Sequence, residues 1–432
     1  MKFFLHRTVV ALGLSLLFMG VYGFCNNFTV GREDVGMIRF AWEQWIPFLP
    51  WMTVPYLSID LFFVTAPFLI REGDRLSRFS RRVVFVVLVA GVCYLIFPLT
   101  VAADRPSFGG PLGAVWDWFK GMDKPHNLMP SLHMALRTLL AAVYVRHTRG
   151  WIRWAAGLWF SLIGFSTLTT YQHHFIDVYT GILLGVVALQ CCGPYPWAIG
   201  RSANVAVARR YGLGALVMGV AVVLSWPVGF FLLWPLVSFL GMAAAYAGFR
   251  PAVYRKEEGL VVFCSWMLYA PVLWGQWISW AYYSRLSRPW DEVVPGVWLG
   301  RQLLASEARR AVQSGVTAVL DMTIEFSEPD PFCQVSYLNI PVLDLTAPTV
   351  EQLDQAARYI EAHAGEGIVY VHCKAGYSRS AAALAAYLMR SGRSGSVEAA
   401  CALIRQKRPG VVIRPEILAA LDKFDVELQQ PL

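Results

Sequence analysis

The segment 367–389, GIVYVHCKAGYSRSAAALAAYLM, decides the fold of the carboxy-terminal part of the chain. Its first five residues form an apolar run with the length and β-branched content of a buried strand. Its alanine-rich end, after Ser380, is typical of a helix. The residues between them include Cys373, Gly376 and Arg379. The pattern predicts a strand, a short loop and a helix that starts at the loop, which is a unit of an α/β domain.

The predicted loop has the residue types of an anion site. Backbone amides that point from a loop and a helix amino terminus bind phosphate. The same positive helix end should lower the pKa of Cys373 below about 8.5, so that its sulfur is a thiolate nucleophile. Gly376 allows a tight turn, Arg379 offers a planar fork to two phosphate oxygens, and Ser380 can donate to the sulfur when it leaves. The residues expected to surround the phosphate are Lys374, Ala375, Gly376, Tyr377 and Ser378.

A nucleophilic cysteine needs a proton donor for the leaving alkoxide. Asp344, in the apolar segment 341–345, precedes Cys373 by 29 residues. A carboxyl group there would act first as general acid and then as general base. Asp321 and Asp330 lie in the same part of the chain and are alternatives for this role.

These residues match a known pattern. The segment 372–380 resembles HCxxGxxR[ST], the signature of the protein tyrosine phosphatase superfamily, and the segments 297–300, 340–344 and 408–409 resemble its dual-specificity branch. The resemblance implies an α/β phosphatase domain over residues 289–432. It also implies that Cys373 forms a phosphocysteine, that Arg379 binds phosphate and that Asp344 is the acid.

Lys374 bears on the substrate. The HCKAG form of the loop is similar to that of superfamily members that act on phosphoinositides and on phosphatidylglycerophosphate. An additional cation suits a strongly anionic headgroup. A lysine that only contacts solvent is the alternative.

Composition predicts a second, membrane-embedded part. Hydrophobic residues make up 56% of the chain and charged residues 15%, against about 25% charged residues in soluble proteins. The excess of apolar residues ends before the phosphatase-like segment. Its runs approach the length of roughly 20 residues that a bilayer requires. The expected spans are 8–25, 51–70, 83–101, 132–146, 154–170, 176–195, 211–229, 231–248 and 259–280.

The distribution of charge indicates orientation and partners. The net charge of +8 comes from basic residues in short loops between apolar segments, as in 71–82. This pattern favours contact with lipid over nucleic acid, and the positive-inside rule predicts a cytoplasmic amino terminus. The expected membrane is the cell (inner) membrane. Nine spans would place residues 289–432 outside and eight would place them inside, so the side of the phosphatase-like domain stays open.

The eight cysteines form no CxxC pair. A disulfide framework, a metal site and a cofactor are therefore not expected. Apart from Cys373, the cysteines are interpreted as small buried hydrophobic residues.

A second group of polar residues lies at the ends of the predicted spans. His173 and Asp177 are four residues apart and share one face of a helix, so the carboxylate can orient the imidazole as a nucleophile. His133 could then protonate the leaving oxygen. Arg105 and Ser131 stand in the neighbouring segments 105–106 and 130–133.

This group resembles the type-2 phosphatidic acid phosphatase superfamily, which implies a six-helix core over about 50–196. The Pro-Ser-Leu-His form of 130–133 is similar to the inositolphosphoceramide synthase branch, so headgroup transfer is an alternative to hydrolysis. Pro98, Leu132 and Thr167 depart from the family pattern. Asp60 and Arg137 are charges inside predicted spans, and we expect them to pair.

The sequence therefore predicts a multi-span all-α membrane domain followed by an α/β cysteine-phosphatase domain. The expected parts are 1–49, an amino-terminal anchor and outward loop; 50–196, the membrane core; 197–288, additional spans; and 289–432, the phosphatase. The expected activity is hydrolysis of phosphomonoesters, on lipid headgroups in the first place. The alternatives are a lipid phospho-headgroup transferase whose phosphatase domain trims the product, and a membrane-anchored phosphoprotein phosphatase.

Overall fold

The structure is a computed structural model that describes residues 2–101, 104–193, 203–249 and 253–429. The chain divides into two compact units. The amino-terminal unit comprises Met1–Pro196 with Ser225–Phe231, and the carboxy-terminal unit comprises Trp197–Leu224 with Leu232–Leu432. Among the described residues, 203–224 and most of 232–288 thus pack with the phosphatase-like domain.

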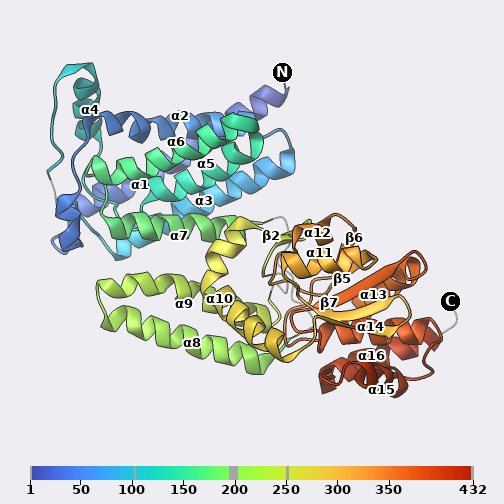
Figure 1. The fold of residues 1–432 in the computed structure, drawn as a ribbon. Coiled ribbons are helices and arrows are strands. Elements are labelled where there is room, and N and C mark those ends of the chain that lie inside the picture. The colour runs from blue at the N-terminus through green and yellow to red at the C-terminus, as the bar shows by residue number, and fades with distance from the viewer. Residues whose placement is uncertain (1, 102–103, 194–202, 250–252, 430–432) are drawn as a thin grey trace. The chain divides into compact units, whose positions relative to one another are not determined.

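The amino-terminal unit is helical, and most of its helices lie alongside one another (Figure 1). Their bounds are α1 (Lys2–Val30), η1 (Ala41–Trp45), η2 (Pro50–Met52), α2 (Thr53–Leu69), α3 (Gly73–Ile96), α4 (Gly110–Met122), α5 (Leu132–His147), α6 (Gly150–Thr169) and α7 (Phe175–Cys191). Large apolar side chains of α1, such as Leu12 and Leu16, are exposed. Such a surface is stable in hydrocarbon and not in water.

Five helices in the described residues are long and apolar enough to cross a membrane. They are Phe3–Val30, Pro50–Leu69, Gly73–Ile96, Val205–Leu224 and Val228–Tyr246, and Phe175–Cys191 is a shorter apolar helix. The chain is therefore a membrane protein with several spans. The expected spans at 132–146, 154–170 and 259–280 are also helices, but they are shorter or less apolar than this group.

Two glycines of α7 bring it close to α5. A Cβ on Gly181 would lie 2.4 Å from the carbonyl oxygen of Ser131, and one on Gly185 would lie 2.7 Å from Cβ of Thr138. The amide of Ser131 donates to the carbonyl of Asp177 at 3.0 Å. The close packing therefore places the segments 130–133 and 173–177 next to each other.

The carboxy-terminal unit begins with helices and a small hairpin and continues into a five-stranded sheet. The first elements are α8 (Val205–Leu224), α9 (Leu233–Tyr246), β1 (Lys256–Glu257), β2 (Leu260–Val261) and α10 (Phe263–Leu286). Between α8 and α9 in the sequence is η3 (Val228–Leu232), most of which belongs to the amino-terminal unit. The sheet contains β3 (Trp290–Val294), β4 (Val297–Arg301), β5 (Val316–Asp321), β6 (Ser336–Asn339) and β7 (Ile368–Cys373).

The sheet has the order β3-β4-β7-β5-β6, with β3 antiparallel to β4 and the other neighbours parallel. The helices that accompany it are α11 (Ala305–Gln313), α12 (Asp330–Cys333), α13 (Val350–His363), α14 (Arg379–Arg390), α15 (Val397–Lys407) and α16 (Pro415–Gln429). Strand β7 is central, and its residues Val369 and Val371 are fully buried. Because parallel strands end at one edge, the residues that follow β4, β5 and β7 meet there. The predicted fold class is confirmed.

Candidate active site

The loop between β7 and α14 is built as a tight cradle. Strand β7 ends at Cys373 and α14 begins at Arg379. Gly376 has φ +71°, and a Cβ there would lie 2.4 Å from the carbonyl oxygen of Gly300. A larger residue would therefore be strained and would push the loop away from β4. The carbonyl of Gly376 accepts from Nε of Arg408 at 3.0 Å, which fixes the loop from outside.

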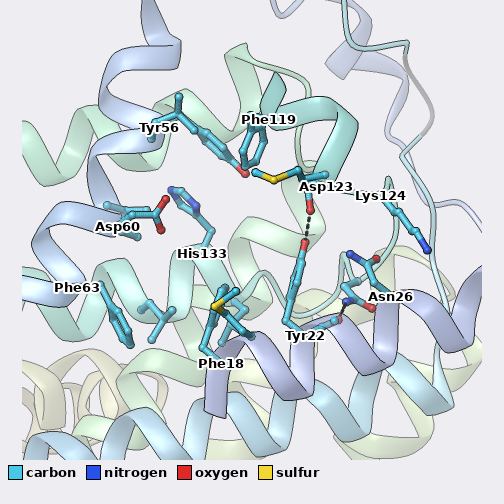
Figure 2. A pocket seen from close by; sticks show the side chains of 18 of the residues that line it. Phe18, Tyr22, Asn26, Tyr56, Asp60, Phe63, Phe119, Asp123, Lys124 and His133 are labelled. Atoms are coloured by element: carbon cyan, nitrogen blue, oxygen red, sulfur yellow. Dashed lines mark hydrogen bonds between the residues drawn. The ribbon is translucent and has the colours of Figure 1, made fainter. Parts of the chain in front are cut away.

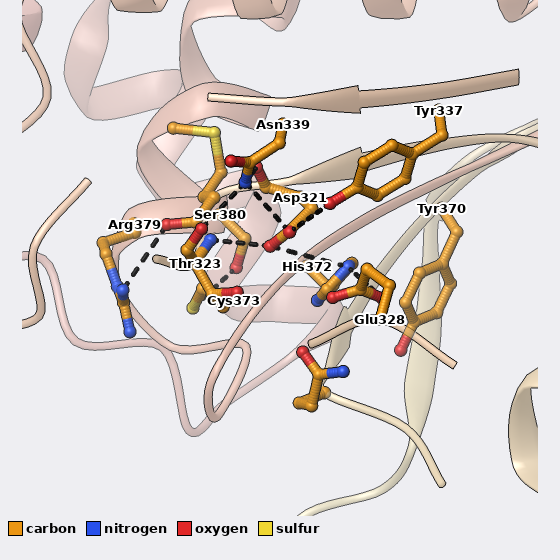
Figure 3. Close-up of polar contacts among 12 residues, drawn as sticks. Asp321, Thr323, Glu328, Tyr337, Asn339, Tyr370, His372, Cys373, Arg379 and Ser380 are labelled. Atoms are coloured by element: carbon orange, nitrogen blue, oxygen red, sulfur yellow. Dashed lines mark hydrogen bonds and ion pairs between the residues drawn. The ribbon is translucent and has the colours of Figure 1, made fainter. Parts of the chain in front are cut away.

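Cys373 lies at the base of this cradle and is 3% exposed. Ser380 Oγ donates to its sulfur at 3.2 Å (Figure 3). Burial alone would raise the pKa of Cys373, but Arg379 and the hydrogen bonds from residues 378 and 380 outweigh it and lower the pKa below that of an ordinary thiol. The sulfur is thus stabilised as a thiolate in the geometry expected for a nucleophile.

Arg379 is buried and held from several sides. Its guanidinium makes a bidentate ion pair with Glu325, at 3.0 and 2.6 Å, and donates to the carbonyl of Val342 at 2.8 Å. Asp344 Oδ1 lies 3.3 Å from the same group. Glu325 was missed by the sequence analysis. The sequence feature that could have identified Glu325 is its position as an acidic residue just beyond the carboxyl end of β5, the strand next to β7.

Asp344 reaches the loop from the segment after β6. Its Oδ2 accepts from Nζ of Lys374 at 2.8 Å. Burial raises the pKa of Asp344, but Arg379 and Lys374 outweigh burial and hold this pKa at about 2. Among the three carboxylates considered from the sequence, Asp344 is thus the one placed beside Cys373 and Arg379.

Asp321 has another environment, behind the loop. Its carboxylate accepts from Tyr337 at 2.7 Å and from Asn339 at 2.9 Å (Figure 3). It also contacts the ammonium group of Lys256. His372 lies 3.8 Å from the same carboxylate. Asp330, the third candidate, begins α12. The Asp321 carboxylate therefore belongs to a buried cluster of charged residues and does not face the cradle.

This cluster also includes Glu328. Donor atoms of Asp321, Glu328 and His372 lie within 4.8 Å of one another, a spacing that suits a metal ion. Lys256 Nζ, however, lies 3.5 Å from Glu328 and contacts Asp321. Burial would lower the pKa of Lys256, but the two carboxylates outweigh burial and raise it. The positive charge that these carboxylates require is thus supplied by a lysine side chain.

The residues of the second predicted group also come together, in the amino-terminal unit. His173 Nδ1 lies 3.6 Å from Oδ2 of Asp177, whose carboxylate also accepts from the amide of His174 at 2.8 Å. Nδ1 of His174 lies 3.0 Å from Oε2 of Glu43 instead. Of the two adjacent histidines, His173 is therefore the one that lies beside Asp177 and remains available to a substrate.

Arg105 and His133 complete this arrangement. Arg105 pairs with Asp123 at 3.1 Å and donates to Oε1 of Gln172 at 3.1 Å. His133 stacks on Tyr56 with ring centroids 4.4 Å apart. Both His133 and His173 line a cavity of about 400 Å³. Ser131 caps α5 by accepting from the amide of Met134 at 3.2 Å, which is a structural contact.

The expected pair between Asp60 and Arg137 is not formed among the described residues. Arg137 donates to the carbonyl of Phe160 at 2.6 Å. Asp60 lines the cavity beside His133 (Figure 2). The prediction was wrong because a helix carbonyl satisfies the guanidinium and because the cavity lets Asp60 face polar residues.

Comparison with known proteins identifies the two parts of the chain. Residues 297–426 match the family model of the dual specificity phosphatase catalytic domain. Phosphatidylglycerophosphatase and protein-tyrosine phosphatase 1 of Homo sapiens is 34% identical over 158 residues, which cover 34% of this chain and 78% of that protein. The chain belongs to the dual-specificity phosphatase family. It is a phosphatase of the hydrolase class, as the sequence predicted.

Two other relatives show how the match varies. Phosphatidylglycerophosphate phosphatase PTPMT2 of Arabidopsis thaliana is 30% identical over 152 residues, covering 34% of this chain and 66% of that protein. Dual specificity protein phosphatase 16 of Homo sapiens is 32% identical over 139 residues, covering 32% of this chain and 21% of that protein. The similarity to these relatives covers about a third of this chain, and the chain spans only about a fifth of dual specificity protein phosphatase 16.

Residues 80–201 match the family model of the PAP2 superfamily. The chain is therefore a fusion of a PAP2 domain with a dual-specificity phosphatase domain, and the predicted resemblances are confirmed. In the PAP2 domain, Pro98, Leu132 and Thr167 occupy positions where the family pattern led us to expect Lys, Gly and Arg. Lys124 is a cation that lines the cavity of His133 and His173.

Proposed function

We propose that the phosphatase domain hydrolyses phosphomonoesters through a phosphocysteine intermediate at Cys373. The thiolate attacks phosphorus, and the bond between phosphorus and the ester oxygen breaks. Protonated Asp344 gives its proton to the leaving alkoxide, which departs as an alcohol. In the second step the Asp344 carboxylate takes a proton from a water molecule, and that water attacks phosphorus. Inorganic phosphate and the Cys373 thiolate are the products.

The observation that carries this proposal is the convergence of three side chains. The Cys373 thiol and the Arg379 guanidinium flank one loop, and the Asp344 carboxylate meets them there from a distant segment. The arriving phosphate dianion binds Arg379 and weakens its hold on Asp344, so the pKa of Asp344 rises as the substrate binds. Ser380 donates to the sulfur when it leaves in the second step. The loop residues 374–378 surround the phosphate.

We propose a phosphorylated lipid headgroup as the substrate. The phosphatase domain shares one chain with membrane helices, and two of its relatives carry a phosphatidylglycerophosphate phosphatase name. Lys374 adds a cation next to Asp344, which suits a highly anionic headgroup. A phosphoprotein is the alternative substrate, and phosphopeptides belong in the same assay.

A direct test replaces the nucleophile in the full-length protein in detergent. We expect Cys373→Ser to reduce phosphate release from p-nitrophenyl phosphate by at least about 10³-fold, because oxygen at this position is not ionised near neutral pH. Cys401→Ser is the matched control, since Cys401 is buried in α15 away from the loop. Undiminished release by the Cys373 variant would overturn the proposal.

The PAP2 domain supports a second function, the transfer or hydrolysis of a lipid phosphate. The observation that favours it is that His173, next to Asp177, shares a cavity with His133. We propose that His173 attacks phosphorus, that His133 protonates the leaving oxygen and that Arg105, held by Asp123, binds a phosphate oxygen. His173→Ala should then remove a lipid activity that Cys373→Ser leaves in place.

We further propose a cytoplasmic amino terminus in a cell (inner) membrane, with the four parts 1–49, 50–196, 197–288 and 289–432. The support is the clustering of arginines in 71–82, at the junction between α2 and α3 and in the first turns of α3. Reporter fusions after residue 80 and at the carboxy terminus test this topology. A cytoplasmic signal is expected from the first, and a periplasmic signal there would refute the orientation.

A further inference from the structure

The cleft above the phosphatase loop has two walls of different chemistry. Its volume is about 650 Å³, and one wall consists of the loop residues with Asp344 and Arg414. The other wall is contributed by three apolar helices. Tyr211 comes from α8, Phe239 from α9, and Val272 and Gly275 from α10, which also contributes the polar side chains of Gln276, Ser279 and Tyr283. The reacting sulfur therefore faces a surface that the phosphatase domain itself does not supply.

A polar contact fixes α10 to the catalytic loop. Gln276 Oε1 accepts from Nζ of Lys374 at 2.9 Å, and Lys374 also donates to Asp344. The side chain of Gln276 is also hydrogen-bonded to the hydroxyl of Tyr211 on α8. An amide in an apolar helix needs such partners, because leaving it unsatisfied is costly. The two helices are thus joined to the loop at the position of its lysine.

Further contacts hold α10, in the turn after Gln276, and the start of α8. Trp280 donates to the carbonyl of Gln302 at 3.0 Å. Trp277 packs edge-on against Phe326 with ring centroids 4.9 Å apart. Asn204, just before α8, donates to the carbonyl of Leu345, the residue after Asp344, at 2.8 Å. The helical wall is therefore anchored to segments on several sides of the active site.

The apolar wall continues along α8 and α9. Between these helices lies an open groove of about 630 Å³, lined by Gly212, Gly219, Val220, Leu236 and Leu240 among others. Tyr211 of α8 and Phe239 of α9 line the cleft, and the residues that follow them in the sequence, Gly212 and Leu240, line the groove. Both helices are apolar enough to cross a membrane. The groove therefore lies where hydrocarbon is expected.

We infer that α8, α9 and α10 form a lipid-binding wall that presents membrane-anchored phosphomonoesters to Cys373. The phosphate occupies the loop while the acyl chains of the same molecule stay against the apolar wall. A phosphopeptide would bring backbone amides and carbonyls to this wall and leave them without partners. The inference rests on the proposed phosphatase activity and names its substrate class, an acyl-chain phosphomonoester that enters from the bilayer.

Gly275 offers a direct test. It faces the cleft, and an added Cβ there meets no heavy atom within 4 Å. Gly275→Ala and Gly275→Leu therefore add volume to the cleft in steps, and both residues favour a helix more than glycine does. Ile278→Leu is the matched control, because Ile278 is on the same helix and 72% exposed.

The assay uses the full-length protein in nanodiscs or mixed micelles, with His173→Ala in the native reference and in every variant so that the proposed lipid activity of the PAP2 site does not contribute. Its substrates are dioleoyl phosphatidic acid, glycerol 3-phosphate, a phosphotyrosyl peptide and p-nitrophenyl phosphate. We expect kcat/KM for the dioleoyl lipid to exceed that for glycerol 3-phosphate and for the peptide by at least about tenfold. We expect Gly275→Leu to lower the ratio of lipid to p-nitrophenyl phosphate hydrolysis by about tenfold, Gly275→Ala to lie between, and Ile278→Leu to match the native protein.

Equal use of lipid, glycerol 3-phosphate and peptide by the native protein would overturn the inference. So would an equal loss on lipid and p-nitrophenyl phosphate in both Gly275 variants. These results are distinct from failure of the proposed function, which would appear as p-nitrophenyl phosphate hydrolysis that survives Cys373→Ser. If Gly275→Leu does not fold, the comparison of Gly275→Ala with the native protein carries the same test.

Discussion

Asp344 is paired with two cations in the substrate-free site. Lys374 and Arg379 hold its pKa at about 2 against the effect of burial, which alone would raise it. A general acid must carry a proton when the leaving group departs. The charges around Asp344 therefore set the pH range in which the free enzyme is ready for the first step.

This arrangement predicts the effect of Lys374→Met on the pH profile. Loss of the ammonium group removes stabilisation of the carboxylate, so the pKa of Asp344 rises. Its protonated form then persists to higher pH, and the basic limb of kcat/KM for p-nitrophenyl phosphate should move up by roughly one pH unit. Lys407→Met, at an exposed position in α15, is the control. A basic limb that stays in place or moves to lower pH would contradict the role of Lys374.

Glu325 acts on the active site through Arg379. Its bidentate ion pair fixes the plane of the guanidinium that must meet the phosphate. We expect Glu325→Gln to reduce kcat/KM by about 10–100-fold, the equivalent of one charge-assisted hydrogen bond. Inhibition by inorganic phosphate should weaken in parallel. Glu366→Gln, which changes an exposed residue of the same type, should leave both quantities unchanged. Normal phosphate inhibition in the Glu325 variant would show that Arg379 is positioned without it.

The hairpin of β1 and β2 is a small element with a large electrostatic effect. It carries Lys256, whose side chain is 2% exposed, to the two fully buried carboxylates of Asp321 and Glu328. These carboxylates lie behind the strand that ends at Cys373. The hairpin thus connects the helical segment before α10 with the interior of the phosphatase domain.

Removal of Lys256 would leave two carboxylates without their cation. Breaking a buried ion pair on one side costs on the order of 3–5 kcal/mol. We expect Lys256→Met to lower the free energy of unfolding of the carboxy-terminal unit by about 3 kcal/mol, measured by denaturant unfolding of the full-length protein in detergent. Lys423→Met, at an exposed position in α16, is the control. Equal stability of the two variants would show that the cluster is not stabilised by Lys256.

The same cluster makes stability depend on pH. The pKa of Asp321 is held at about 2 in the folded protein, because Lys256 and His372 outweigh burial. An unfolded aspartate has a pKa of about 3.9. The stabilisation is therefore present above about pH 4 and is lost as the pH falls towards 2. This acid-induced loss should be smaller in Lys256→Met, and an unchanged loss would assign it to other groups.

At the scale of the whole molecule, the chain carries two candidate phosphate sites in separate units. The site of Cys373 belongs to the carboxy-terminal unit and the site of His173 to the amino-terminal unit. Their chemistry is different, since one uses sulfur and the other imidazole as the nucleophile. Each site can therefore be removed without changing the residues of the other.

This separation predicts two independent activities. We expect Cys373→Ser to abolish hydrolysis of p-nitrophenyl phosphate and to retain part of the lipid phosphate turnover. We expect His173→Ala to retain hydrolysis of p-nitrophenyl phosphate and to lose that part of the lipid phosphate turnover. Phosphate release and lipid products are measured for each single variant and for the double variant. If Cys373→Ser alone removes all lipid turnover, the PAP2 site is inactive under these conditions.

Local patterns in the sequence were sufficient for the main outline of the protein. Apolar runs predict membrane helices because the bilayer sets their length. The segment 367–389 predicts its strand, loop and helix because nucleophile, glycine turn and arginine are neighbours in the chain. For the same reason, the amino-acid sequence alone names the residues of the phosphate loop and of the His173–Asp177 pair.

The partners of these residues were decided only by the tertiary structure. The sequence left Asp344, Asp321 and Asp330 open, and packing of the sheet places Asp344 at the loop and Asp321 among buried charges. Glu325 and Gln276 reach the site from segments 54 and 98 residues away from their partners. Such contacts depend on how strands and helices far apart in the chain pack together, which periodicity and local spacing do not record.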